Sequence, residues 1–222
     1  MSHGKLSDLP ASFLFRYRFA VPRVSQLPER WPERPEGWLP NPADLDRSAP
    51  LPARLWAGWN ERGCGFLFRV TDKQHPPGGD AHQLEQADRC RLWIDTRCTQ
   101  NVHRATQYCH ALVAYPQVTE GSRRRPLLQQ VSIPQARGDA PRRAARLAEI
   151  RFAPERNGYR LLIWLPAEAL HGFDPEQQRE IGFFWLVRDS ELGLSLPAYD
   201  TDVPFVRDPS VWFVAQLADE SP

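Results

Sequence analysis

The chain has 222 residues, 41% of them hydrophobic and 25% charged, and a formal net charge of +1 at pH 7. That hydrophobic fraction is enough for a folded core and excludes global disorder. The near-zero charge excludes a general electrostatic attraction to nucleic acids or acidic membranes. The length fits one large all-β domain. Eight Trp and eleven Phe residues are many for this length, and flat rings suit both sandwich cores and sugar-stacking surfaces.

The first residues of the sequence lack the apolar run of a secretory signal, and no stretch reaches the roughly 18 apolar residues of a membrane span. We therefore expect a cytoplasmic protein of bacterial type with no membrane partner. In that compartment cysteines are expected to be reduced thiols rather than a disulfide framework. The four cysteines are Cys64, Cys90, Cys98 and Cys109.

The N-terminal part of the chain has two contrasting segments. Residues 12–20 alternate between aromatic and other side chains, and a period of two predicts a half-buried strand. Residues 22–52 contain eight prolines together with Trp31 and Trp38. Proline lacks the N–H that a sheet needs, so this segment is predicted to wrap irregularly over the surface, anchored by its two tryptophans.

Short strands then recur at the spacing of a two-sheet sandwich. Asn157-Gly158 is a strong hairpin signal, and Pro166 is predicted to open a single short helix over 166–170. No strands alternate with long helices, which argues against a doubly wound fold. We predict one all-β domain over 1–222, an antiparallel sandwich of jelly-roll or immunoglobulin-like type. The predicted strands lie near 53–59, 65–71, 90–96, 107–115, 148–153, 158–165, 181–189 and 211–217.

Residues 117–146 carry seven arginines against two acids, Glu120 and Asp139, in a chain that is otherwise nearly neutral. We predict an arginine-rich loop over this segment, and one interpretation is that the loop is simply solvated. The other is a binding site for an anionic partner such as RNA, phosphate or an acidic protein. The segment contains no aromatic residue to stack on bases, so a nucleic-acid partner is not expected.

Four segments, in this order, resemble family 9 carbohydrate-binding modules and the wider group of DOMON-like sandwiches. Residues 59–63 read W-N-E-R-G and lead into F-x-F-x-V-x-D over 66–72, and residues 91–95 read R-L-W-I-D. Residues 158–170 read G-Y-R-L-L-I-W-L-P-A-E-A-L, and residues 181–189 begin I-G-F and end V-R-D. The resemblance implies a β-sandwich that binds a carbohydrate. The residues themselves predict no cofactor, and calcium is the one ion that the resemblance implies.

The resemblance covers about 55–190, with two departures. Residues 97–116 are not typical of sugar-binding members, and Leu162 stands where the family motif often has glutamate. The resemblance therefore supports the fold better than it supports sugar binding, because fold does not by itself imply function.

Strand alternation nominates one sheet face for the ligand. If the predicted strands are neighbours, that face combines rings for sugar C–H groups with charged groups for hydroxyls. Replacing Trp93 with alanine is then expected to abolish sugar binding and leave the fold intact. The alternative is an outer face covered by the wrap, with arginines and acids pairing. The nominated residues are Trp93, Trp164, Arg69, Arg91, Asp95, Tyr108, His110 and Arg188.

A group of Cys and His residues, whose side chains are typical zinc ligands, could form a zinc site. Cys98, His103, Cys109 and His110 lie close in sequence, but their spacing is not that of a zinc finger. Adjacent strand residues point to opposite faces, so Cys109 and His110 are not expected to share an ion. We predict no metal site and no catalytic residue. The predicted function is non-catalytic carbohydrate binding, ahead of a protein-interaction domain using 117–146 and of an enzyme using His103 or His110.

Overall fold

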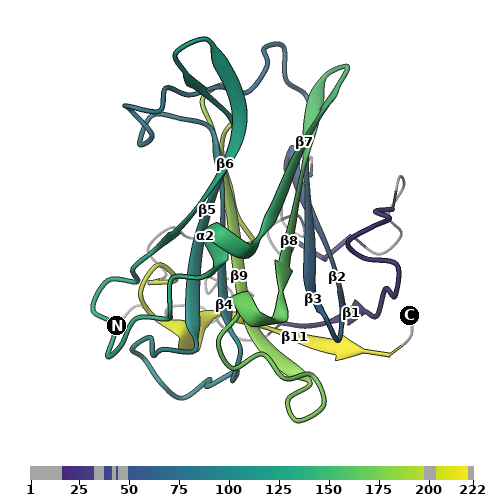
Figure 1. The fold of residues 1–222 in the computed structure, drawn as a ribbon, viewed down its shortest axis with the longest axis vertical. Helices are drawn as coiled ribbons and strands as arrows, with labels where there is room; N and C mark the ends of the chain where they lie inside the picture. Colours follow the sequence, from purple (N-terminus) through teal and green to yellow (C-terminus); the bar gives the residue numbers. More distant parts are fainter. Residues whose placement is uncertain (1–16, 33–37, 42–43, 45–49, 198–203, 220–222) are drawn as a thin grey trace, which may run out of the picture.

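The computed structural model describes residues 17–32, 38–41, 44, 50–197 and 204–219, and two β-sheets packed face to face make up most of it (Figure 1). The large sheet has the order β1 (Arg18–Pro22), β11 (Phe213–Ala218), β9 (Glu180–Asp189), β4 (Arg89–Asp95), β5 (Cys109–Glu120) and β6 (Arg123–Val131), with β10 (Gly193–Ser195) also paired to β9. The small sheet has the order β2 (Ala53–Asn60), β3 (Gly63–Val70), β8 (Gly158–Pro166) and β7 (Glu149–Glu155).

All eight strands predicted beyond residue 52 are present, with ends that move by a few residues, and the predicted β-sandwich is confirmed. The hairpin predicted at Asn157-Gly158 joins β7 to β8, with Glu155 paired to Gly158. The predicted N-terminal strand appears as β1, although residues 12–16 lie outside the described residues. Its pairing with β11 is parallel, unlike the other strand pairs of the described sheets.

The prediction of a loop over 117–146 is wrong. β5 continues to Glu120, turns at Gly121, whose φ of +61° suits glycine, and returns as β6. Arg123–Arg125 pair with the end of β5 and keep their side chains exposed, so the hydrophobic alternation that marks a half-buried strand is missing there. The segment also contains the short helix α2 (Ala144–Leu147), whereas the helix predicted at 166–170 is a 3₁₀ turn over Ala167–Ala169.

The core lies between the sheets and is built from the inward residues of both. Phe66 of the small sheet stacks on Phe183 of the large sheet with ring centroids 5.6 Å apart, and Phe68 meets Trp185 edge to face at 6.1 Å. These rings are almost fully buried. Burial of a large apolar side chain stabilises by about 1.5–3 kcal/mol, so the alternating strands supply the main driving force of the fold.

The wrap covers the outer face of the small sheet. Trp31 and Trp38 pack with Val24 against a cluster that includes Trp56 and Trp164, so the predicted anchoring by the two tryptophans is confirmed. Gly65 makes room for this contact, because a Cβ at that position would lie 2.9 Å from Leu27 and 3.0 Å from Trp31. No helix in the described part of the chain has the length and apolar character needed to cross a membrane.

Candidate functional site

The structure separates the eight nominated residues instead of gathering them on one face. Four of them, Arg91, Trp93, Asp95 and Arg188, share the outer face of the large sheet. Trp164 and Arg69 lie on the outer face of the small sheet, because β3 and β8 belong to that sheet. Trp93 on β4 pairs with Ala111 on β5, so these two side chains share the outer face. His110 is the residue next to Ala111, and its side chain therefore points the opposite way, into the core. Tyr108 precedes β5 and stacks on His171 at 5.1 Å.

Neither nominated tryptophan is accessible to a sugar. Trp93 is 0% exposed and packs edge to face against Phe184 and Phe205 at 6.1 and 5.7 Å. Trp164 is 4% exposed beneath the wrap. The alternative prediction, an outer face covered by the wrap, describes the small sheet correctly. The pairing of arginines with acids that it included is also found there, because Arg69 pairs with Glu155 at 2.8 Å.

Asp95 has a structural role at the end of β4. Its carboxylate accepts hydrogen bonds from the backbone N–H groups of Arg97 and Thr99 and from the Thr99 hydroxyl, at 2.7–3.0 Å. These bonds close the turn that follows the strand, as Asp side chains commonly do. The carboxylate is therefore occupied within the protein and is not presented to a ligand.

His110 is 0% exposed, its Nε2 lies 3.4 Å from the carbonyl oxygen of His171, and its Nδ1 has no partner. Burial lowers the pKa of His110 to about 4 because the charged imidazolium loses its hydration. The imidazole is therefore neutral at physiological pH and has no access to a substrate.

Lowering the pH from 7 to 4 is expected to destabilise the protein by about 3 kcal/mol through His110 alone. The ordinary pKa of 6.5 applies to the unfolded chain and a pKa of about 4 to the folded protein, so the unfolded chain takes up the proton first. The stabilisation is complete above pH 6.5 and is lost as the pH falls toward 4. Urea unfolding at several pH values measures this slope, and the His110→Leu variant should lack this part of it. A variant with the wild-type slope would contradict the assignment to His110.

His103 lies beside a serine and an aspartate, but the arrangement is not a catalytic triad. Its Nδ1 is 3.1 Å from Asp208 and 3.0 Å from the Ser210 hydroxyl, and that hydroxyl also donates directly to Asp208 at 2.6 Å. A triad places the serine and the aspartate on different ring nitrogens. Asp208 instead caps the 3₁₀ turn Pro209–Val211 by accepting from the Ser210 N–H.

The Cys and His residues considered for zinc do not converge. Among the described residues, no group of three or more His, Cys, Asp and Glu side chains is arranged to hold a metal ion. Cys109 and His110 face opposite sides of β5, as predicted. Burial raises the pKa of Cys109 to about 12 and also raises that of Cys98, so both thiols are protonated and are poor zinc ligands. All four cysteines are free thiols.

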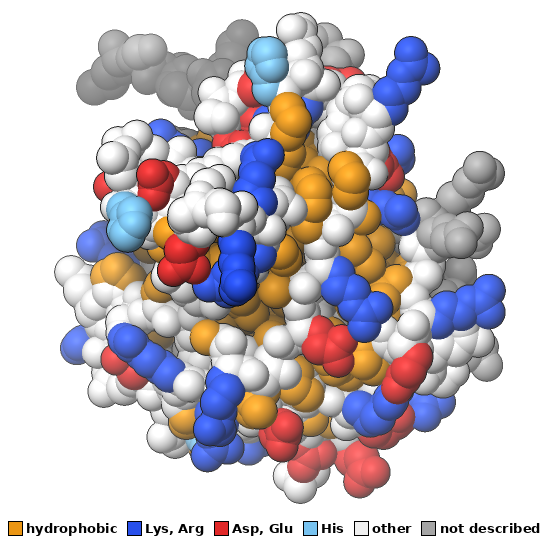
Figure 2. Space-filling model, turned by 45° about the horizontal axis from the view of Figure 1, so that its top comes forward, with side chains coloured by type: hydrophobic (Ala, Val, Ile, Leu, Met, Phe, Trp, Pro, Cys, Tyr) orange, Lys and Arg blue, Asp and Glu red, His pale blue; other side chains and the backbone are white. Residues whose placement is uncertain are grey.

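The end of the sandwich opens into a cleft of about 320 Å³ between the two sheets. We call it the inter-sheet cleft. One wall is the segment 73–77, the second is formed by Gln117 and Arg124 at the end of the β5–β6 hairpin, and the third by Phe152 and residues 154–156 of β7 and its turn. Figure 2, in which this end is turned forward, shows hydrophobic side chains exposed between Lys and Arg side chains. The volume lies in the range of small-molecule sites.

The first wall of the inter-sheet cleft is fixed by a buried ion cluster. The side chain of Lys73 is 2% exposed, and its Nζ lies 2.6 Å from Asp189, 3.5 Å from Glu191 and 3.9 Å from Asp88. Glu191 in turn accepts from the backbone N–H groups of Gln74 and His75 at 2.6 and 3.1 Å. These bonds, opposed by burial and assisted by Lys73, lower the pKa of Glu191. The wall is therefore held in place before any ligand arrives.

The same cluster tests the calcium ion that the family resemblance implies. Calcium takes six to eight oxygen ligands at roughly 2.3–2.6 Å. Asp88, Asp189 and Glu191 supply carboxylates, but the ammonium group of Lys73 occupies the space between them at 2.6–3.9 Å. A calcium ion placed there would collide with Lys73, so these residues do not fit the ion.

The inter-sheet cleft offers hydrogen-bonding side chains that are not used within the described protein. Glu155 is committed to Arg69 and Arg160, and Arg124 donates to the Pro77 carbonyl at 2.7 Å. The side chains of Gln74, His75, Gln117 and Arg156 line the cleft, and none of them forms a side-chain hydrogen bond or ion pair with another described residue. Sequence reasoning missed this set because its members come from three separate segments.

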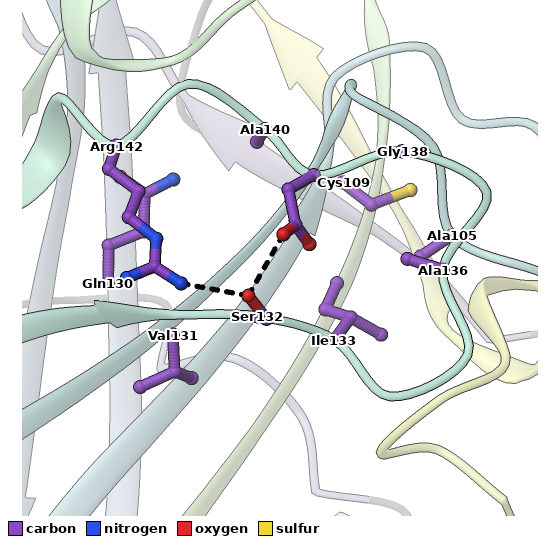
Figure 3. Close-up of a pocket in the computed structure, with 11 residues that line it drawn as sticks. Ala105, Cys109, Gln130, Val131, Ser132, Ile133, Ala136, Gly138, Ala140 and Arg142 are labelled. Carbon is purple, nitrogen blue, oxygen red and sulfur yellow. Dashed lines mark hydrogen bonds between the residues drawn. The ribbon is translucent and has the colours of Figure 1, made fainter.

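A second pocket, between β6 and residues 133–142, is too small for an organic ligand. Its volume is about 10 Å³, which is enough for one water at most. In Figure 3 the bonds that cross it run from Arg142 to Ser132 and from Ser132 to Asp139, at 2.9 and 3.0 Å. This pocket is therefore only a small gap in the packing of the 133–142 loop against β6.

Comparison with known proteins supports the fold through structure alone. No family model matches the sequence, and no curated protein sequence matches it. The structure is similar to a family 9 carbohydrate-binding module from Caldicellulosiruptor kristjanssonii in complex with cellotriose, with a TM-score of 0.54, 14% identity, and coverage of 92% of this chain and 95% of that one. For a module of the same family and organism in complex with glucose the values are 0.55, 14%, 92% and 97%. The predicted likeness to the family 9 sandwich is thus confirmed at the level of the fold.

Proposed function

We propose that this protein is a non-catalytic carbohydrate-binding domain whose ligand lies in the inter-sheet cleft. The observation that carries the proposal is a preformed cleft of about 320 Å³ whose lining includes four polar side chains, those of Gln74, His75, Gln117 and Arg156, with no side-chain partner among the described residues. The likeness of the fold to modules in complex with cellotriose and glucose supports the same class of ligand.

The lining of the cleft suits a polyhydroxylated ligand. Phe152 is half-buried and presents an apolar surface to the cleft, and such a surface packs against the C–H groups of a sugar ring. The amides of Gln74 and Gln117 each offer a donor and an acceptor, and the guanidinium of Arg156 offers several donors. Hydroxyl groups need this mixture, because each is both donor and acceptor.

The proposal assigns no chemistry to the cleft. Of the carboxylates at the cleft, Glu155 is paired with two arginines and Glu191 is bonded to backbone N–H groups and Lys73. A general acid or base must be able to exchange a proton with the substrate, and neither carboxylate is free to do so. These contacts leave neither carboxylate available as a catalytic acid or base.

We expect Arg156→Ala and Gln117→Ala each to weaken binding of cellotriose or glucose about tenfold, which is the effect of losing one hydrogen bond to a ligand. Isothermal titration calorimetry measures the change. The matched control is Arg151→Ala, because Arg151 is an exposed arginine of β7 that pairs with Glu149 and does not line the cleft. A folded wild-type protein that binds no sugar on a glycan array would overturn the proposal, as would an equal loss in the control.

A further inference from the structure

Three arginines stand together on the outer face of the large sheet. Arg89 of β4 and Arg188 of β9 are directly opposite each other in register, and Arg91 follows Arg89 by two residues on the same face. Side chains opposite each other on antiparallel strands are roughly 5 Å apart at Cβ, and neighbours two residues along a strand are roughly 7 Å apart. We call Arg89, Arg91 and Arg188 the arginine face.

No carboxylate of the described residues forms an ion pair with the arginine face. Arg89 donates only to the backbone carbonyls of Glu85 and Ala87. Arg91 lies with its guanidinium 4.6 Å from the ring centre of Trp93, and its buried Nε has no partner. Like charges placed directly opposite on a sheet destabilise it, and among the described residues no carboxylate pairs with this positive cluster.

The small sheet provides an internal comparison. Arg54, Arg69 and Arg160 also lie opposite one another, on β2, β3 and β8. There, one carboxylate serves two of the three arginines, because Glu155 pairs with Arg69 at 2.8 Å and with Arg160 at 3.2 Å. Two of the three arginines of that row therefore share a carboxylate, whereas no described carboxylate pairs with any arginine of the arginine face.

The surroundings of the arginine face are those of a binding surface. Tyr115 lies on the neighbouring strand, and burial raises its pKa while Arg89 and Arg91 oppose that rise, so its phenol is a neutral donor beside the guanidinium groups. The charge of Glu85 also acts on Tyr115, and the Glu85 carboxylate forms no ion pair with the three arginines. Leu194, opposite Arg188 on β10, is 42% exposed and is the single large hydrophobic residue exposed among those described.

We propose that the arginine face binds a tetrahedral oxyanion, the phosphate or sulfate ester group of a ligand. Guanidinium groups bind such oxygens through paired hydrogen bonds. Side chains whose Cβ atoms lie roughly 5–8 Å apart on neighbouring strands can turn toward one ester group together. The site is distinct from the inter-sheet cleft, which contains none of the three arginines. The inference therefore does not rest on carbohydrate binding in the cleft.

Calorimetric titration of the full chain with sodium phosphate and with sodium sulfate, at constant ionic strength set by sodium chloride, tests the proposal. The wild-type protein is expected to bind at least one of the two anions above the chloride background. Arg188→Gln is expected to weaken that binding about tenfold, the loss of one charge-assisted bond, and Arg91→Gln likewise. Arg188 is exposed, so its variant tests the site even if Arg91→Gln fails to fold.

The matched control is Arg69→Gln, which removes from the small sheet an arginine that pairs with Glu155. It is expected to bind the anion as the wild-type protein does. Binding of phosphate alone or of sulfate alone would identify the ester and support the site. A wild-type protein that binds neither anion, or an equal loss in Arg69→Gln and Arg188→Gln, would overturn the proposal.

Discussion

Replacing Trp93 with alanine is expected to lower the free energy of unfolding by about 3–5 kcal/mol. The indole is 0% exposed and is enclosed by a cluster that includes Phe184, Phe205 and Trp212. Its removal leaves a large cavity in the layer that covers the large sheet, and the arginine stacked on its ring loses that contact as well. Urea-induced unfolding monitored by circular dichroism measures the change.

Leu194→Ala is the control for this prediction, because Leu194 is an exposed hydrophobic residue on the same side of the large sheet. A surface substitution of that kind is expected to stay within about 0.5 kcal/mol of the wild type. If Trp93→Ala retained the wild-type stability and lost only sugar binding, the pattern-based assignment of Trp93 to a ligand surface would be correct and the packing described above would be wrong.

Replacing Lys73 with methionine is expected to destabilise the protein by about 3–5 kcal/mol. The ammonium group is buried against Asp189, whose two oxygens accept from it at 2.6 and 2.7 Å, and Asp88 lies 3.9 Å away. Methionine keeps the length of the side chain but leaves these buried carboxylates without a cation. Glu191 also loses its contact with Lys73, so we expect the cleft wall at 73–77 to loosen and sugar binding to weaken.

A double-mutant cycle with Asp189→Asn isolates the ion pair. If the pair acts as described, the double variant should lose less stability than the sum of the two single variants, by about 0.5–3 kcal/mol. Strict additivity would mean that Lys73 and Asp189 contribute independently. The cycle is informative because Asp189 also closes a turn through the N–H groups of Glu191 and Leu192, and that contribution cancels in the coupling energy.

The strands could be predicted from the sequence because their inward hydrophobic residues recur at every second position, as in β3 with Phe66, Phe68 and Val70. β6 escaped prediction since its first residues are exposed arginines whose partners lie on β5. A search for hydrophobic residues at every second position does not detect a strand that begins in this way. The pairing is that of a short hairpin, which turns at Gly121 between Glu120 and Arg123.

The candidate site could not be predicted because alternation sorts residues within one strand but does not orient one strand against another. Trp93 and His110 both follow their own strand's pattern correctly, yet they lie on opposite faces of the large sheet. The inter-sheet cleft depends on Lys73 meeting Asp189, and these residues are far apart in the chain. Asp189 ends the 181–189 motif, which is visible in the sequence. That motif gives no indication that the partner of Asp189 is a lysine.

The parallel pairing of β1 with β11 has a consequence for biosynthesis. During translation β1 emerges early, but its neighbour in the sheet, around Val214, is made only near the end of the described chain. Until β11 is made, β1 lacks its partner strand, and the edge of β9 that pairs with Phe213 is unpaired. The indole N–H of Trp59 also lacks its hydrogen-bond acceptor, the carbonyl oxygen of Ala218. A ribosome-bound intermediate thus exposes an unpaired strand edge, the kind of surface that chaperones shield from self-association.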